Sequence, residues 1–172
     1  MSASVVIILI IEIVFAICYG KYIGKKEERV RKLNTDFRNY YEVVSRWIIM
    51  KNSGRKLEEY FKSSGIKNVA IYGAGPLGEM VYQELQDSEI NIFYVIDQSK
   101  KKFETLKENS IIHPSQIKDM KMPDAIVITP MVHKSDIMDL LCSMNLPASV
   151  SFLVLDEIVN YFVTHEVQNE IV

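Results

Sequence analysis

The sequence contains few of the residues that build metal sites and disulfide frameworks. Its two cysteines are Cys18 and Cys142, and its three histidines are His113, His133 and His165. They are too few and too scattered for a zinc site or a set of disulfides, so we expect neither. Glycine and proline are also scarce, with seven and five residues among 172, which excludes collagen-like and low-complexity chains. A hydrophobic content of 48% excludes an intrinsically disordered chain.

The chain has almost no net charge, with 20 basic and 22 acidic residues giving −2. A dedicated nucleic-acid-binding protein normally has a net basic domain, so that class of partner is excluded. The distribution is uneven, however. Residues 1–20 carry only Glu12 (−1), residues 21–67 carry 13 basic and 6 acidic residues (+7), and residues 68–172 carry 7 basic and 15 acidic residues (−8). The near-neutral total therefore conceals three unlike segments.

The first segment is an apolar run that contains one charge. Residues 3–23 supply 21 positions, about enough for a helix across the ~30 Å hydrocarbon core of a bilayer. A central acid such as Glu12 costs about 2.5–3.5 kcal/mol on insertion scales. The ten apolar residues from Val5 to Phe15 return about 3–6 kcal/mol, so insertion is favoured by a narrow margin. We therefore predict a transmembrane anchor at residues 1–23, in which Glu12 is either tolerated or hydrogen-bonds a second transmembrane helix.

Basic residues follow this run and none precedes it, as Lys21, Lys25 and Lys26 illustrate. A cleavable signal peptide would have positive charge ahead of its apolar run and a small-residue cleavage site after it, for which Ala16-Ile17-Cys18 is a weak candidate. The charge distribution favours an uncleaved anchor. By the positive-inside rule, it predicts a single-pass protein of the cell membrane, with its N-terminus outside and its C-terminal domain in the cytoplasm.

Residues 24–65 are predicted to form a basic, helical linker between the anchor and a domain at residues 66–172. Apolar residues recur at three- and four-residue steps within residues 23–50: Ile23, Val30, Leu33, Phe37, Tyr40, Val44 and Trp47. This spacing predicts an amphipathic helix, which packs either on its own domain or against a second copy or a membrane partner. Asn52-Ser53-Gly54 ends the helix, and residues 56–62 give one more short amphipathic helix.

The few glycines are concentrated in one motif. The strand-type run at residues 69–72 meets Gly73-Ala74-Gly75-Pro76-Leu77-Gly78, a complete G-x-G-x-x-G. A helix follows, and then a second strand at residues 90–96, which Asp97 closes. Strand, glycine turn, helix, strand and an acid 19 residues after the third glycine are together typical of a dinucleotide-binding βαβ unit.

The chemistry of phosphate binding explains this spacing. Gly73 allows the tight turn out of the strand, Gly75 lets the backbone approach a pyrophosphate, and Gly78 permits close packing of helix on strand. Pro76 and Leu77 begin the helix, where the missing N–H of proline costs nothing. The free amides and the helix dipole then face the phosphates.

Asp97 indicates which nucleotides would fit. Its carboxylate can accept hydrogen bonds from a ribose diol and would repel a 2′-phosphate, which favours NAD or a nucleotide sugar over NADP. The alternative is that the glycines merely form a tight turn over an empty crevice.

The remaining residues complete an α/β fold. Helices are expected at 99–107, at 134–144 and after a capping Asp156, and strands at 111–112, 124–129 and 150–155. Alternating strands and helices predict a doubly wound, parallel, five-stranded Rossmann-like sheet with its ligand site at the carboxyl edge. About 105 residues leave no room for a second, substrate-binding domain.

Residues with catalytic roles are hard to find in this domain. The loop after the strand at 124–129 has no Tyr-x-x-x-Lys, and the sequence has no serine nucleophile elbow. His133 could be a general base at the carboxyl edge, although a loop histidine beside proline is more often a surface residue, and the same applies to His113. Cys142 is expected to pack within its helix. We therefore predict no catalytic residue.

Three segments carry a resemblance to a known family: 68–78 (NVAIYGAGPLG), 94–97 (YVID) and 124–129 (DAIVIT). Over about residues 66–160 the chain resembles the Rossmann-like "CoA-binding" accessory domain of bacterial surface-polysaccharide enzymes. That domain accompanies transmembrane helices in polyprenyl-phosphate sugar-1-phosphate transferases and in membrane nucleotide-sugar dehydratases. A similar module begins sugar acyltransferases.

The resemblance implies a membrane-anchored accessory or regulatory protein of surface-glycan assembly that binds NAD or a nucleotide sugar. Two alternatives remain open. The first is an NAD-dependent oxidoreductase or epimerase that takes its substrate site from a partner, and the second is a ligand-free scaffold.

Overall fold

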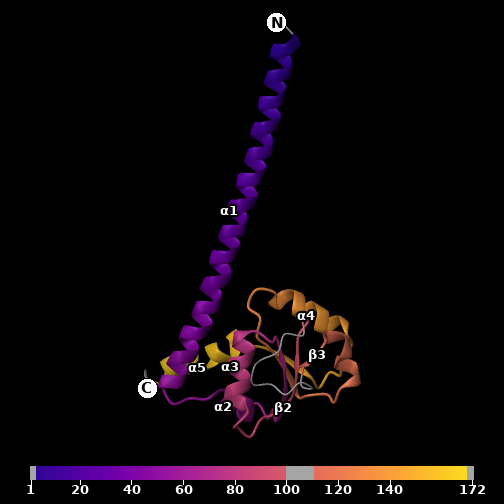
Figure 1. Cartoon of the computed structure of the whole chain (residues 1–172). Coiled ribbons are helices and arrows are strands. Elements are labelled where there is room, and N and C mark those ends of the chain that lie inside the picture. Colours follow the sequence, from indigo (N-terminus) through magenta and orange to yellow (C-terminus); the bar gives the residue numbers. More distant parts are fainter. Residues whose placement is uncertain (1–2, 100–110, 170–172) are drawn as a thin grey trace. The chain divides into compact units, whose positions relative to one another are not determined.

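The computed structural model describes residues 3–99 and 111–169, with the side chains of residues 12–99 and 111–164. The chain forms two compact units, Met1–Tyr41 and Glu42–Val172. Helix α1 (Ala3–Asn52) contributes to both units (Figure 1). The predicted helix over residues 23–50 is confirmed, and so is the predicted stop, because Gly54 adopts a φ of 81° immediately after α1.

In the first unit, large apolar side chains of α1 are exposed, among them Phe15, Leu33 and Phe37. No helix in the described part of the chain combines the length and the apolar character needed to cross a bilayer. Within the predicted anchor at residues 1–23, the structure describes side chains only for residues 12–23.

The last turns of α1 belong to the second unit, where Val43, Trp47 and Met50 are buried. The predicted stripe is confirmed at Trp47, whereas Val44 is only partly buried and its neighbour Val43 is buried instead. The neighbouring elements decide which face of α1 is buried. One of them is the C-terminal helix, where Asp156 pairs with Arg46 on α1 at 2.6 Å.

The core of the second unit is a five-stranded parallel sheet, as predicted. Its strands are β1 (Asn68–Tyr72), β2 (Asn91–Ile96), β3 (Ile111–Ile112), β4 (Ala125–Ile128) and β5 (Ser151–Val154). They are arranged in the order β3-β2-β1-β4-β5. From β1 the chain runs through β2 and β3 on one side of the sheet and then returns to β4 and β5 on the other side of β1. The direction reverses between β1 and β4, and ligands of open α/β sheets bind outside the carboxyl ends of the strands at such a point.

Helices cover both faces of the sheet (Figure 1). Helices α3 (Pro76–Leu85), α2 (Leu57–Ser63) and α5 (Leu155–Asn169) lie on one face. Helix α4 (Lys134–Ser143) and the 3₁₀ helix η2 (Pro114–Asp119) cover the other, where Ile137, Leu141 and Ile117 pack on strand residues of alternating positions.

The smaller elements differ from the predicted ones at several places. The helix predicted at residues 99–107 lies almost wholly outside the described residues. The helix η2 was not predicted. Asp156 does not precede α5 as a cap, because α5 begins at Leu155 directly after β5, and the Asp156 carboxylate pairs with Arg46 on α1. Cys142 is exposed on α4, so the expectation that it packs is wrong, and the neighbouring Leu141 occupies the buried position instead.

Candidate functional site

A cavity of about 410 Å³ lies at the carboxyl ends of β1, β2 and β4. It is lined by Tyr72, Gly73, Asp97, Gln98, Ser99, Pro130, His133, Asp136 and Ile137. Of the predicted site residues, Gly73 and Asp97 line this cavity. Gly75, Pro76, Leu77 and Gly78 do not line it, and they form the start of α3 directly after Gly73.

Two glycines of the motif are required by the fold itself. Gly73 has a φ of 107°, and a Cβ there would lie 2.7 Å from Thr129 Oγ1. A Cβ on Gly78 would lie 1.9 Å from the carbonyl oxygen of Gly73, which no small adjustment can relieve. Thr129 is buried against both positions, and its hydroxyl lies 3.0 Å from the Tyr72 carbonyl oxygen. These contacts confirm the turn and the close helix–strand packing expected of Gly73 and Gly78.

Gly75 differs from the other two glycines. It is the N-cap of α3, with φ −93° and ψ −177°, an extended conformation that any residue adopts. A Cβ at this position would meet no atom within 4 Å. Serine, asparagine or aspartate would cap the helix better than glycine does. Nothing in the described chain therefore requires a glycine at position 75.

The first turn of α3 offers hydrogen-bond donors that the chain does not use. The backbone N–H groups of Gly75, Leu77 and Gly78 make no hydrogen bond to any described residue. Pro76 has no N–H and occupies the first helical position, as predicted. The helix dipole adds about half a positive charge at this end. Free amides at the start of a helix are a suitable binding site for phosphate or carboxylate.

Asp97 has a second role that the sequence did not indicate. Its Oδ2 accepts a hydrogen bond from the backbone N–H of Ala74 at 2.8 Å, which ties the glycine loop to the end of β2. Its Oδ1 accepts hydrogen bonds from the Ser99 backbone N–H at 2.7 Å and from the Ser99 hydroxyl at 2.5 Å. Asp97 therefore holds the loop in place, and its role toward a ribose stays a prediction.

Tyr72 is a residue of the cavity that sequence reasoning missed. It is the last residue of β1 and is 3% exposed, and its hydroxyl has no hydrogen-bond partner among the described residues. Burial raises the pKa of this phenol, and the negative charge of Asp97 raises it further. The nearby Gln98 side chain lowers the pKa by less than burial raises it, and it makes no hydrogen bond of good geometry with the hydroxyl. The phenol therefore stays neutral at physiological pH. A strand-end tyrosine before the motif was the only signal in the sequence.

The two candidate histidines have different surroundings. His133 precedes α4 at the rim of the cavity, and its Nδ1 lies 3.2 Å from Asp136 Oδ2, with side chains that are 62% and 80% exposed. His113 lies outside the cavity and caps η2, where its Nδ1 accepts a hydrogen bond from the Ser115 backbone N–H at 3.3 Å. Among the described residues, no three potential metal ligands come together.

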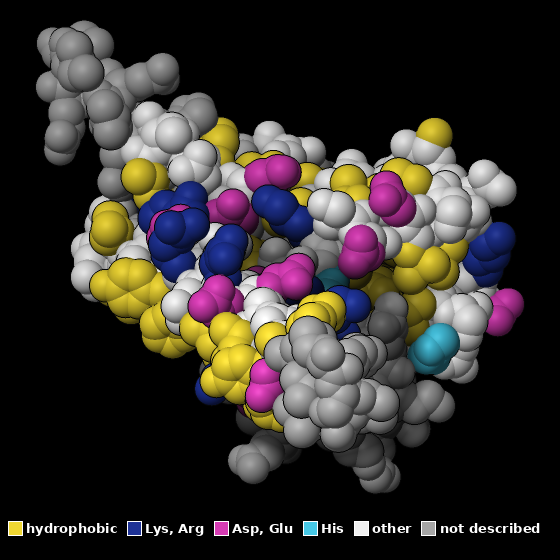
Figure 2. Space-filling model, turned by 90° about the horizontal axis from the view of Figure 1, so that it is seen from above, with side chains coloured by type: hydrophobic (Ala, Val, Ile, Leu, Met, Phe, Trp, Pro, Cys, Tyr) yellow, Lys and Arg dark blue, Asp and Glu magenta, His cyan; other side chains and the backbone are white. Residues whose placement is uncertain are grey.

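Among the described residues that line the cavity, the carboxylates are Asp97 and Asp136, and none is a lysine or an arginine. Basic side chains lie elsewhere on the surface, and Figure 2 shows Lys and Arg interspersed with Asp and Glu on the face that it presents. A charged group of a ligand therefore finds its favourable contacts at the amides of α3 rather than within the cavity.

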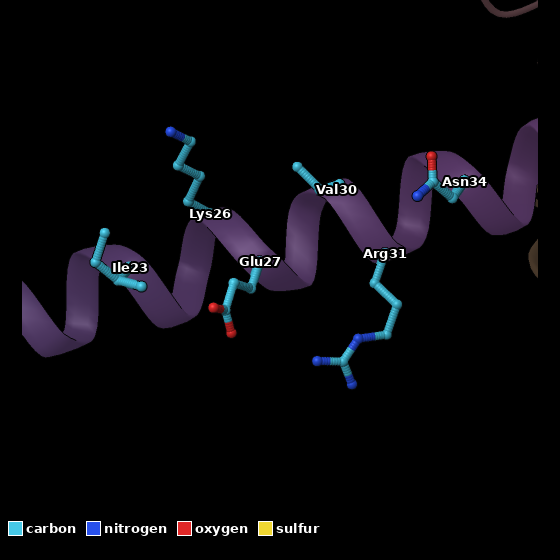
Figure 3. Close-up of a pocket in the computed structure, with 6 residues that line it drawn as sticks. All are labelled: Ile23, Lys26, Glu27, Val30, Arg31 and Asn34. Carbon is cyan, nitrogen blue, oxygen red and sulfur yellow. The ribbon is translucent and has the colours of Figure 1, made fainter.

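A second hollow lies on α1, with a volume of about 530 Å³, and its described lining residues all belong to that one helix: Ile23, Lys26, Glu27, Val30, Arg31 and Asn34. They occupy successive turns, with side chains that point away from the helix axis (Figure 3). Among the described residues, none from another element lines this hollow. The pairing of this face with a second chain stays a prediction.

Comparison with known families gives one match. Residues 65–149 match a family model described as C2185-like, N-terminal. The matched segment includes β1 to β4, the glycine motif and α4, and amounts to just under half of the chain. No curated protein and no solved structure matches the chain. The segment that carries the candidate site is thus similar to the N-terminal domain of C2185-like proteins.

Proposed function

We propose that residues 66–172 form a nucleotide-binding domain whose ligand places its phosphates at the start of α3. The observation that carries this proposal is Gly75. The fold accounts for Gly73 and Gly78, whereas at Gly75 a side chain would enter open space. The absence of a side chain there keeps the backbone accessible, which is the condition for a pyrophosphate to approach the loop.

The neighbouring residues support the same ligand class. The unused amides of Gly75, Leu77 and Gly78 can donate hydrogen bonds to phosphate oxygens. The cavity of about 410 Å³ begins at Gly73, next to these amides, and is of the size of small-molecule sites. It has room for the uncharged part of a nucleotide ligand. NAD and a nucleotide sugar are the two candidates that Asp97 favours over NADP.

The wider role that we propose is that of an accessory or regulatory protein in surface-polysaccharide assembly, attached to the cell membrane by residues 1–23 with its C-terminal domain in the cytoplasm. The support for this role is the apolar run that contains Glu12, the basic residues after it and the family resemblance of residues 66–160. A C-terminal reporter that is active only in the cytoplasm tests the topology. Activity outside the cell, or full release of the protein into the soluble fraction, would contradict it.

Ligand binding can be tested by thermal unfolding of the full chain with NAD, NADP, UDP, UDP-glucose and CoA. A ligand at 100 times its Kd adds about 2.7 kcal/mol of stability. We expect Gly75→Val to lose this gain, because the branched side chain blocks the approach of phosphate, while the unliganded protein unfolds as before. Gly24→Val is a matched control, since Gly24 also has open space around its missing Cβ.

Two outcomes would contradict the proposal. If no nucleotide stabilises the wild-type chain, the domain is the ligand-free scaffold. If Gly75→Val binds as well as wild type, the glycine loop is not the phosphate site. The oxidoreductase or epimerase alternative additionally requires turnover of a nucleotide sugar with NAD, which the absorbance of the reduced cofactor would report.

A further inference from the structure

The Tyr72 hydroxyl is buried and has no hydrogen-bond partner among the described residues. Its ring is packed on the α4 side of the sheet, with Ile96 and Ile137 in the same cluster of buried side chains. A phenylalanine would fill this space equally well without burying an unpaired hydroxyl, which is unfavourable. Because Tyr72 also lines the cavity at the carboxyl edge, the missing partner can come from a ligand.

A second buried tyrosine provides a comparison inside the same sheet. Tyr94 on β2 is 2% exposed, and its hydroxyl likewise has no partner among the described residues. In the parallel register Tyr94 pairs with Ala70, two residues before Tyr72, and it does not line the cavity. The two phenols therefore share burial, sheet face and lack of a partner, and they differ in access to the cavity.

The groups around Tyr72 restrict what its hydroxyl can contact. Among the described lining residues, Gln98 is neutral, and Asp97 and Asp136 are acidic. These two carboxylates would repel an anionic group of a ligand, and an apolar group would leave the hydroxyl unpaired. A cation would lose its hydration beside the buried phenol, so the complementary chemistry is an uncharged group that donates or accepts a hydrogen bond.

We propose that Tyr72 is a ligand-contact residue whose hydroxyl hydrogen-bonds an uncharged polar group that extends from the ligand's phosphates into the cavity. The inference rests on the proposed function, and it divides the site into an anion-binding part at α3 and a neutral part at Tyr72. A sugar hydroxyl and a carboxamide share this chemistry. Tyr72 thus discriminates a complete ligand from one that ends at the phosphates or at a bare ribose.

Calorimetric titration of the full chain with two pairs of probes tests this. UDP-glucose against UDP isolates the contribution of the sugar, and NAD against ADP-ribose isolates the contribution of the nicotinamide carboxamide. We expect Tyr72→Phe to weaken binding of UDP-glucose or of NAD about tenfold, as loss of one hydrogen bond does, and to leave its truncated counterpart unchanged. The pair that responds identifies the source of the polar group. Tyr94→Phe, the matched control, should leave all four affinities unchanged.

The stability of the unliganded variants gives an independent reading. Neither substitution removes a hydrogen bond to a described residue, so both melting temperatures should equal or exceed that of the wild type. A marked fall for Tyr72→Phe would show that the hydroxyl has a partner inside the chain, which would overturn the inference. Equal affinities of Tyr72→Phe and wild type for every probe would overturn it while leaving nucleotide binding intact. Failure of all four probes to bind wild type would instead refute the proposed function and this inference with it.

Discussion

The two ends of helix α3 are built in opposite ways. At its start, three backbone amides are unused by the described chain and Gly75 faces open space. Near its end, Glu84 is 10% exposed and its carboxylate is fully engaged. Oε2 accepts a hydrogen bond from the Trp47 indole at 2.8 Å and lies 3.3 Å from Lys51 Nζ, and Oε1 accepts one from the Leu57 backbone N–H at 2.9 Å.

This difference separates the part of the helix that is free to bind from the part that holds the domain together. The helix dipole disfavours a carboxylate at the C-terminal end, so the donors around Glu84 must outweigh that effect. Through them Glu84 joins α1, α2 and α3. At the start of α3, the helix dipole and the unused N–H groups favour an anion, and no described acidic side chain accepts hydrogen bonds from the N–H groups of Gly75, Leu77 and Gly78.

The largest effect that we expect comes from the start of α3, at the glycine that packs rather than the one that is open. Gly78→Ala would place a Cβ 1.9 Å from the Gly73 carbonyl oxygen, so helix and strand must separate. We expect a loss of about 3 kcal/mol in the free energy of unfolding, measured by urea titration. Gly75→Ala has open space around its Cβ and should lose only the N-cap preference for glycine over alanine, about 1 kcal/mol or less. Equal losses would remove the distinction between the two glycines.

At the other end, Glu84→Ala leaves the Trp47 indole and the Leu57 N–H without their acceptor. We expect a loss of about 2 kcal/mol, together with a change in Trp47 fluorescence, because this is the only tryptophan. Glu84→Gln keeps one acceptor oxygen and should lose about half as much. Ligand affinity should stay unchanged in Glu84→Gln. If its affinity fell as far as that of Gly75→Val, the two ends would not be separable.

The smallest effect concerns pH, and it extends the comparison to the edge of the sheet opposite the cavity. Asp124 Oδ2 accepts hydrogen bonds from the backbone N–H groups of Lys67 at 3.0 Å and Asn68 at 2.8 Å. These bonds lower the pKa of Asp124 below its usual value. A lowered folded-state pKa means that the contribution to stability is present above the unfolded value near 3.9 and is lost as pH falls through the folded value.

Unfolding measured between pH 7 and pH 3 should therefore show a loss of stability at the acid end that Asp124→Asn reduces. If Asp124→Asn had the same pH dependence of stability as the wild type, protonation of Asp124 would not be the cause of the loss at acid pH.

The fold was predictable from local patterns in the sequence. Apolar runs marked all five strands, and the glycine motif located the turn between Tyr72 and Pro76 together with the direction of α3. The strand order was not predicted, because right-handed crossovers fix the face on which each connection lies and not which strands are neighbours. The roles of Gly73 and Gly78 were also correct, since close packing after a tight turn is a property of that spacing.

What could not be predicted depends on packing between distant segments. Glu84 and Trp47 are 37 residues apart, and no periodicity in the sequence predicts that the Trp47 indole donates a hydrogen bond to the Glu84 carboxylate. The bond from the Ala74 amide to Asp97 and the unpaired Tyr72 hydroxyl likewise appear only when strands and loops are in place. On α1 the burial of Trp47 was predicted, whereas the burial of Val43 in place of Val44 was not.

Thr129 sets a limit on how this site could be altered by evolution or by design. Its side chain fills the space between the end of β4 and the glycine loop, within 3.2 Å of where a Cβ on either Gly73 or Gly78 would lie. Substitutions at Gly73 and Thr129 are therefore expected to be epistatic, whereas a Cβ on Gly78 would lie 1.9 Å from the Gly73 carbonyl oxygen whatever residue stands at position 129. New ligand preferences would be acquired more readily at Gly75, which no neighbour constrains, and at Gln98, whose side chain borders the cavity.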